Sequence, residues 1–125
     1  MTNARRFISV AAVGAVLALS AARAHHSPIA FDTTVTDFAL VGEIEYVDVR
    51  NPHSIMELRV PAADGTAQTW HIEFSSVNLL LRRGWDFERL KVGEKVKCVG
   101  NPSASGKHEM YMWSIVLADG TEFGR

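Results

Sequence analysis

Hydrophobic residues recur at every second position along several short stretches of the chain, the period of a strand that buries one face. In one such stretch Met56, Leu58 and Val60 share a face. The pattern predicts five strands, over residues 38–49, 54–60, 66–74, 95–100 and 109–117. In the first of them, Gly42 is expected to mark a bulge or a bend.

The hydrophobic period changes between the third and fourth strands. Val77, Leu80 and Leu81 follow helical spacing, a serine before them can cap a helix, and Gly84 is a natural stop. Three strands, one helix and two strands is the element order of the OB-fold, a small, partly open barrel. The sequence therefore predicts a mainly β, OB-like five-stranded barrel with one short helix, with a small sandwich or a roll as the alternatives.

The last predicted strand has two candidate faces. Its apolar face is expected to carry Tyr111, Trp113, Ile115 and Leu117. By alternation, His108, Met110 and Met112 fall on the opposite face. Thioethers suit Cu(I), but methionine more often fills gaps in a hydrophobic core.

The first two dozen residues have the pattern of a secretory signal peptide. Arg5 and Arg6 supply the positive start, residues 7–22 form an uncharged and mostly apolar run, and 22–24 fit a small-x-small cleavage site. The apolar run is shorter than the ~20 residues that a spanning helix needs, so stable membrane insertion is not expected. The sequence thus predicts export to the bacterial periplasm or secretion.

Cleavage after Ala24 divides the chain into a signal peptide (1–24), an N-terminal arm (25–37) and an OB-like barrel domain (38–125). From position 25 onward ten Lys and Arg face 14 Asp and Glu, a net charge of −4 with histidines neutral. No nucleic-acid partner is expected, because sequence-independent binding needs charge that neutralises phosphates. A hydrophobic content of 47% can build a core, and the single Cys98 excludes a disulfide scaffold.

The predicted cleavage would make His25 the first residue, followed by His26. A free α-amine has a pKa near ~7.7–8.0, so it loses its proton readily when a metal competes for it. The amine and imidazole of one terminal histidine can chelate the same ion. Such nitrogen ligands suit Cu(II), Ni(II) or Zn(II), with copper bound most tightly. The alternative is a polar, mobile terminus without a ligand.

A second group of candidate ligands is expected on the hairpin formed by residues 54–60 and 66–74. The two core faces of the hairpin must meet, which places His53 opposite Glu73, or opposite His71 if the pairing shifts by two residues. Either way the three side chains share the face away from the core, within reach of one ion. Imidazole and carboxylate suit zinc or copper, although Glu73 can instead hold the tautomer of His53. The alternative is a solvated strand face with a weak histidine–carboxylate pair.

Five short motifs occur in order along the mature chain. They are His25-His26-Ser27, Asn51-Pro52-His53, Trp70-His71-Ile72-Glu73, Arg83-Gly84-Trp85 and Val92-Gly93-Glu94-Lys95-Val96. In this set the chain resembles the small exported bacterial proteins grouped as domain of unknown function 6152. The resemblance implies an exported single domain with an OB-like fold, and it supplies no activity, cofactor or catalytic residue. The chain departs from the family pattern at Pro28, where an aromatic residue usually follows His-His-Ser.

Together these features predict an exported small binding protein that holds copper, with zinc as the alternative metal. The candidate ligands are His25, His26, His53, His71 and Glu73. An extended 13-residue arm reaches up to ~43 Å, so its first residue can fold back to form a three-nitrogen site with His53. The alternative is a metal-free OB-like module that binds a protein, a glycan or a small ligand. A small copper oxidase is a third hypothesis, less favoured because so short a chain offers little room for a substrate pocket.

Overall fold

The computed structural model describes residues 30–124, so the predicted signal peptide and the first five residues of the predicted arm lie outside it. The elements follow in the order β1 (Phe38–Asp48), β2 (Ser54–Pro61), β3 (Ala67–Phe74), α1 (Val77–Arg82), the 3-10 helix η2 (Phe87–Arg89), β4 (Lys95–Pro102), β5 (Glu109–Leu117) and β6 (Glu122–Phe123). Between positions 30 and 124, the structure contains no helix with the length and hydrophobicity needed to cross a membrane.

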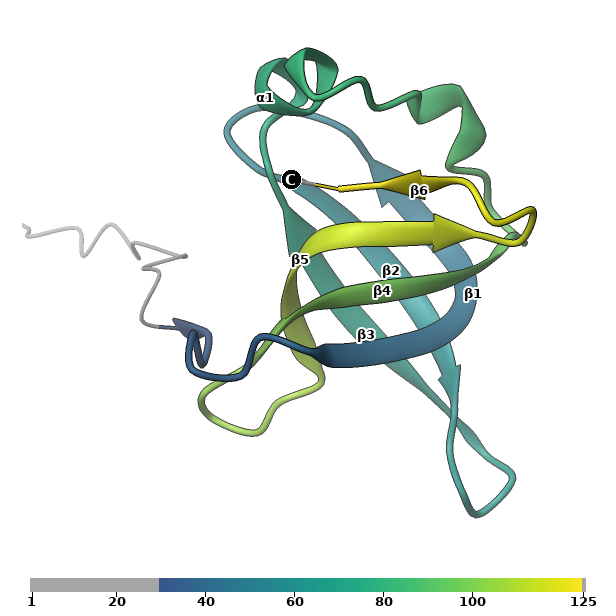
Figure 1. The fold of residues 1–125 in the computed structure, drawn as a ribbon. Coiled ribbons are helices and arrows are strands. Elements are labelled where there is room, and N and C mark those ends of the chain that lie inside the picture. The colour runs from purple at the N-terminus through teal and green to yellow at the C-terminus, as the bar shows by residue number, and fades with distance from the viewer. Residues whose placement is uncertain (1–29, 125) are drawn as a thin grey trace, which may run out of the picture.

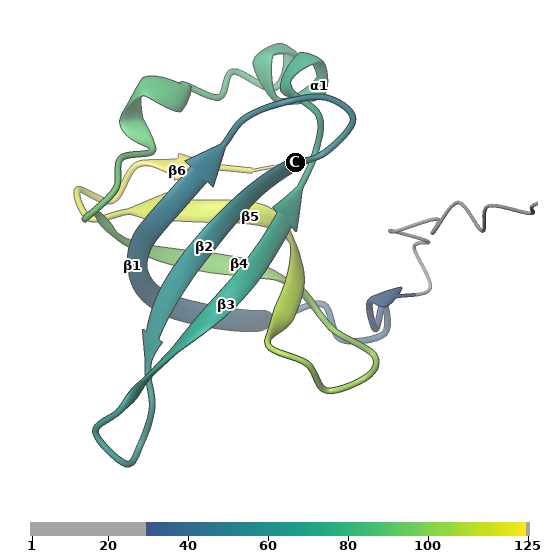
Figure 2. The same cartoon turned by 180° about the vertical axis from the view of Figure 1, so that it is seen from behind.

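The strands form one curled sheet in the order β3-β2-β1-β4-β5-β6. The sheet closes on itself because β3 also pairs with β5, in parallel, with Glu73 beside Tyr111. Figures 1 and 2 show the resulting barrel, with α1 at one end and the β2–β3 turn projecting at the other. The predicted OB-like, five-stranded barrel with one short helix between the third and fourth strands is therefore confirmed. Closure lets every strand of the barrel bury its apolar face while few strand edges stay exposed.

Strand β1 serves both halves of the barrel, because it pairs with β2 and with β4. The expected distortion of this strand occurs at Glu45, the extra residue where the pairing with β2 shifts register. Gly42 has a different role: a Cβ there would lie 2.5 Å from the carbonyl oxygen of Arg59. The glycine thus permits the close approach of two backbones where β1 passes from one partner to the other.

A β-bulge in β5 changes which residues face the barrel interior. Val99 of β4 pairs with Ser114, but the next residue, Gly100, pairs with Met112, which leaves Trp113 as the extra residue. A Cβ on Gly100 would lie 2.1 Å from the carbonyl oxygen of Tyr111, so the bulged strand is tolerated because this position is glycine.

The bulge makes one sequence-based expectation wrong. Ile115 is buried as predicted, but Met110 and Met112 are also buried, whereas Tyr111 and Trp113 are only partly buried and lie on the outer side. Strict alternation had placed both aromatic residues on the core face. The two methionines are thus core-filling residues, and they are separated from His108, which is exposed.

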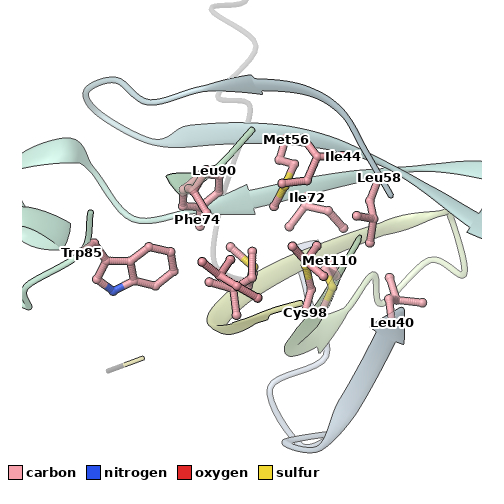
Figure 3. Close-up of a cluster of buried hydrophobic side chains, with 14 of the residues drawn as sticks. Leu40, Ile44, Met56, Leu58, Ile72, Phe74, Trp85, Leu90, Cys98 and Met110 are labelled. Carbon is pink, nitrogen blue, oxygen red and sulfur yellow. The ribbon is translucent and has the colours of Figure 1, made fainter. Parts of the chain in front are cut away.

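Buried hydrophobic side chains fill the barrel (Figure 3), and Leu80 of α1 belongs to the same core. Its buried hydrophobic residues are Leu40, Ile44, Met56, Leu58, Ile72, Phe74, Leu80, Trp85, Leu90, Val96, Cys98, Met110, Met112, Ile115 and Leu117. Trp85 closes the end near α1, stacked between Phe74 and Phe123 with ring centroids 6.1 and 5.5 Å away. Burial raises the pKa of Cys98 to about 12, so its thiol stays protonated and is a poor metal ligand at neutral pH.

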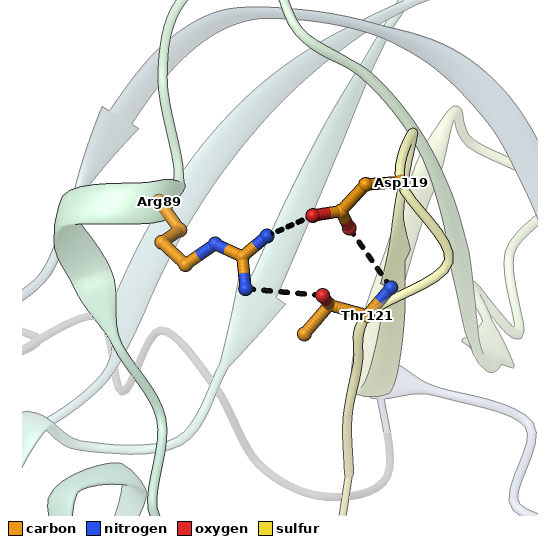
Figure 4. Close-up of polar contacts among 3 residues, drawn as sticks. All are labelled: Arg89, Asp119 and Thr121. Carbon is orange, nitrogen blue, oxygen red and sulfur yellow. Dashed lines mark hydrogen bonds and ion pairs between the residues drawn. The ribbon is translucent and has the colours of Figure 1, made fainter.

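The C-terminal segment makes more contacts with the barrel than the sequence pattern indicated. Strand β6, which alternation did not predict, pairs with β5. The preceding turn is tied to η2, since Arg89 binds the carboxylate of Asp119 and donates a hydrogen bond of 3.0 Å to the hydroxyl of Thr121 (Figure 4). Hydrogen bonds from the backbone and hydroxyl of Thr121, helped by Arg89, lower the pKa of Asp119.

We predict that Gly100→Ala destabilises the protein by about 2 kcal/mol or more, because the added methyl group meets backbone atoms that a rotamer change does not move. Urea unfolding monitored by circular dichroism measures the difference. Gly124→Ala is the matched control, since a Cβ there has its nearest contact at 4.0 Å. Equal stability of the two variants would contradict the role assigned to Gly100 at the bulge.

Candidate functional site

The observed hairpin register differs from both predicted pairings. Ile55 pairs with Glu73 and Glu57 with His71, so His53 precedes the first paired residue of β2 and lies opposite neither predicted partner. The expectation that the apolar faces of β2 and β3 meet is confirmed, since Met56 pairs with Ile72 and both are buried. The turn has five residues, as expected, but it begins one residue later: Pro61 still pairs with Ala67, residues 62–66 stay outside the ladder, and the backbone N–H of Ala62 donates to the carbonyl oxygen of Thr66 at 2.8 Å.

His53 nevertheless contacts Glu73. Its Nδ1 atom forms an ion pair with Oε1 of Glu73, reached from the loop before β2 rather than from directly across the ladder. The side chain of His53 is 41% exposed, whereas that of Glu73 is only 2% exposed. Glu73 lies between Ile55 on one neighbouring strand and Tyr111 on the other, which explains how an outward-facing carboxylate becomes buried. A buried carboxylate needs such a partner, because desolvation without one is costly.

His71 belongs to a different pair. Its Nδ1 lies 2.9 Å from Oε1 of Glu57, its direct neighbour on β2, and both side chains are about one-third exposed. Within residues 30–124, no group of three or more His, Cys, Asp and Glu side chains is arranged to hold a metal ion. The structure therefore joins His53 to Glu73 and separates His71 from them, and His25 and His26 lie outside the described residues.

Two residues that the sequence reasoning did not select complete the surroundings of His53. Tyr111 lies edge-on to His53, with ring centroids 6.4 Å apart, and its hydroxyl is 3.1 Å from the hydroxyl of Ser75. Both residues follow from features that are hard to read in a sequence, namely the β3–β5 pairing and the β5 bulge. The sequence did contain one indication. Met110 and Met112 flank Tyr111, and if both methionines face the core, strand alternation turns Tyr111 outward.

The N-terminal arm reaches this same region. Phe31 packs against Tyr111 with ring centroids 5.9 Å apart and forms an isolated bridge with Ser103. Further hydrogen bonds hold the arm along the end of β4: Ala104 donates to the carbonyl oxygen of Ala30 at 3.0 Å, Asp32 to that of Pro102 at 2.8 Å, and the amide of Asn101 to that of Val35 at 2.7 Å. Figure 1 shows the arm beside the β4–β5 loop. The chain thus enters the described structure next to the aromatic neighbour of His53.

The predicted cleavage site lies close to this region along the chain. Position 25 is five residues before Ala30, and five extended residues span up to ~17 Å. Two successive ring contacts, Phe31 to Tyr111 and Tyr111 to His53, connect the start of the described arm to the histidine.

Comparisons with known proteins give a family for the chain and solved structures that resemble it. The model of a family described as "Family of unknown function (DUF6152)" matches residues 13–111. No curated protein matches the sequence. Among solved structures, the mitochondrial single-stranded DNA binding protein Rim1 of S. cerevisiae aligns with a TM-score of 0.50 and 14% identity, over 70% of this chain and 94% of that one. The N-terminal domain of PriB from Thermoanaerobacter tencongensis, described as dimeric, aligns with a TM-score of 0.49 and 21% identity, over 66% and 96% of the two chains.

We predict that His53→Ala destabilises the protein by about 1–3 kcal/mol, because it removes the imidazole partner of a buried carboxylate. The double variant His53→Ala/Glu73→Gln should recover part of that loss, since a neutral amide is cheaper to bury than a carboxylate. His71→Ala is the matched control and should cost less than about 1 kcal/mol, because its pair with Glu57 is partly exposed. Urea unfolding of the four proteins gives these values. A loss for His71→Ala as large as that for His53→Ala would contradict the special role of the buried pair.

Proposed function

Because the chain belongs to the DUF6152 family, whose description assigns no function, we propose its function from the residues beside the arm. In this proposal it is an exported small protein that binds a transition metal, copper in preference to zinc. The observation that carries the proposal is the pair in which a 2% exposed Glu73 holds Nδ1 of a 41% exposed His53. Histidines that bind metals commonly donate their other ring N–H to a carboxylate, which fixes the tautomer and raises the basicity of the ligating nitrogen.

In the proposed site, Nε2 of His53 is one ligand, and the α-amine and imidazole of His25 supply two more. His26 is the competing ligand for the terminal imidazole. Glu73 is a positioning residue, because it acts on the metal through His53. Three nitrogen ligands of this kind favour Cu(II) by the Irving–Williams order, with Zn(II) as the second choice. His71 is not part of the proposed site, since its Nδ1 is paired with Glu57.

The proposal depends on export. Removal of residues 1–24 would create the α-amine at His25, and it would place the protein in the periplasm or outside the cell. Cys98 and the methionines of β5 play no part, since Cys98 is fully buried with a raised thiol pKa and Met110 and Met112 fill the core. We infer metal binding rather than catalysis, because positioning of a ligating nitrogen accounts for the pairing of His53 with Glu73.

A nucleic-acid ligand is the competing proposal, because the description of Rim1 names single-stranded DNA binding. OB-folds bind oligonucleotides on the face of strands 2 and 3. In this chain that face carries the carboxylate of Glu57, and the neighbouring Glu45 of β1 pairs with Arg59 and accepts a hydrogen bond from Thr69 of β3. Carboxylates at these positions repel phosphates, so we propose that the protein binds no nucleic acid.

We predict that protein beginning at His25 binds one Cu(II), and that the same protein with an acetylated N-terminus binds it at least tenfold more weakly. Acetylation converts the α-amine into an amide, which removes the amine ligand and breaks the chelate. His53→Ala should also weaken binding at least tenfold, and Glu73→Gln by about 10- to 100-fold. Competition titration with a chromophoric chelator measures each affinity.

His71→Ala serves as the matched control and should leave the Cu(II) affinity unchanged. Equal affinity of the N-terminally acetylated protein would show that the terminal amine is not a ligand. An equal loss of Cu(II) affinity in His53→Ala and His71→Ala would show that the histidines bind copper nonspecifically at the surface. Either result would overturn the proposed site.

We predict that the mature protein does not bind single-stranded DNA at physiological salt. Fluorescence anisotropy of a labelled oligothymidylate, measured from low to high salt, tests this directly, because binding through phosphates weakens steeply as salt rises. The expected result is no change of anisotropy at protein concentrations up to ~100 μM, near the weak end of non-specific affinities. Saturable, salt-sensitive binding would favour the nucleic-acid alternative.

A further inference from the structure

A groove of about 420 Å³ lies on the outer surface of the barrel, between the arm and α1. Thr33 and Thr36 of the arm line it, and Arg83 lines it at the end of α1. The outward-facing Tyr111 and Trp113 of β5 and the hydroxyl of Ser75 complete the part of the lining that matters here. Its volume is in the range of small-molecule sites.

The groove carries one charge. Among the described residues that line it, only Arg83 is ionised at neutral pH. No ion pair recorded within residues 30–124 involves Arg83, and residues 1–29 contain neither Asp nor Glu. The guanidinium is thus available for an anionic partner, and its planar fork matches a carboxylate well.

The rest of the lining suits a small amphipathic molecule. Ser75 and Tyr111 already hydrogen-bond to each other at 3.1 Å, which fixes both hydroxyls at the groove. In the described part of the chain, no hydrogen bond is recorded for the hydroxyls of Thr33 or Thr36, whereas the hydroxyl of Thr34 is bonded to Asp32. Trp113 adds an aromatic wall, which favours a flat or apolar ligand body.

The arm that forms one wall is fixed in place. The side-chain amide of Asn101 donates a hydrogen bond of 2.7 Å to the carbonyl oxygen of Val35, between the two threonines. Thr34 donates two hydrogen bonds to Asp32, and these lower the pKa of that carboxyl, so the turn stays formed at neutral pH. The groove is therefore formed before any ligand binds, which reduces the entropic cost of binding.

We propose that this groove binds a small organic carboxylate, with its anionic group at Arg83 and its apolar body against Trp113. The site shares Tyr111 with the proposed metal site but needs no metal. The test therefore uses metal-free protein in excess chelator, so that its failure and the failure of the metal proposal are distinguishable.

Benzoate is the probe, and benzyl alcohol is the neutral probe of similar shape. Indole N–H resonances of the mature, ¹⁵N-labelled protein are followed during titration to ~20 mM, which covers millimolar affinities. Trp113→Phe identifies the resonance of Trp113 among those of the three tryptophans. The expected result is a saturable shift of that resonance with benzoate and a much smaller shift with benzyl alcohol.

Arg83→Gln should weaken benzoate binding about two- to fivefold, the range for an exposed charge pair. Arg82→Gln is the matched control, because Arg82 is the exposed neighbouring arginine and does not line the groove. It should leave binding unchanged. Equal shifts with both probes, equal weakening by both variants, or no shift of the Trp113 resonance at the highest benzoate concentration would overturn the proposal.

Discussion

Closure of the barrel between β3 and β5 is the constraint on which the rest of the surface depends. The parallel pairing places Tyr111 directly beside Glu73, and the bulge at Trp113 leaves both Tyr111 and Trp113 on the outer side of β5. Without closure, Glu73 would be a solvated residue on an edge strand. With closure, it is a buried carboxylate that binds His53, and the outer side of β5 becomes one wall of a groove.

Much of the fold could be predicted from the sequence, because each strand has one buried face. Alternation gave the ends of the five barrel strands to within about two residues, and helical spacing gave α1. The features that were missed arise from pairing rather than from pattern. The hairpin register depends on how the turn at 62–66 closes, the β5 bulge depends on a glycine in another strand, and β6 is too short to show a period.

The candidate site was predictable to a lesser extent. The sequence related His53 to Glu73 and left open that Glu73 holds the tautomer of His53, and the two side chains do contact each other. It also grouped His71 with them, although the observed register pairs His71 with Glu57 instead. Tyr111 and Ser75 could not be found from spacing, because they come together through contacts between residues far apart in the chain.

At the centre of the proposed site is His53, which contacts a buried carboxylate and lies beside Tyr111, the residue that the N-terminal arm also contacts. In the proposed site the barrel would supply one ligand that is already positioned, and export processing would supply the other two. Electron paramagnetic resonance of the Cu(II) complex of the mature protein tests this most directly, because hyperfine coupling counts the nitrogen ligands. The proposed site predicts three nitrogen ligands in the mature protein and two in His53→Ala. The same nitrogen count in both proteins would contradict it.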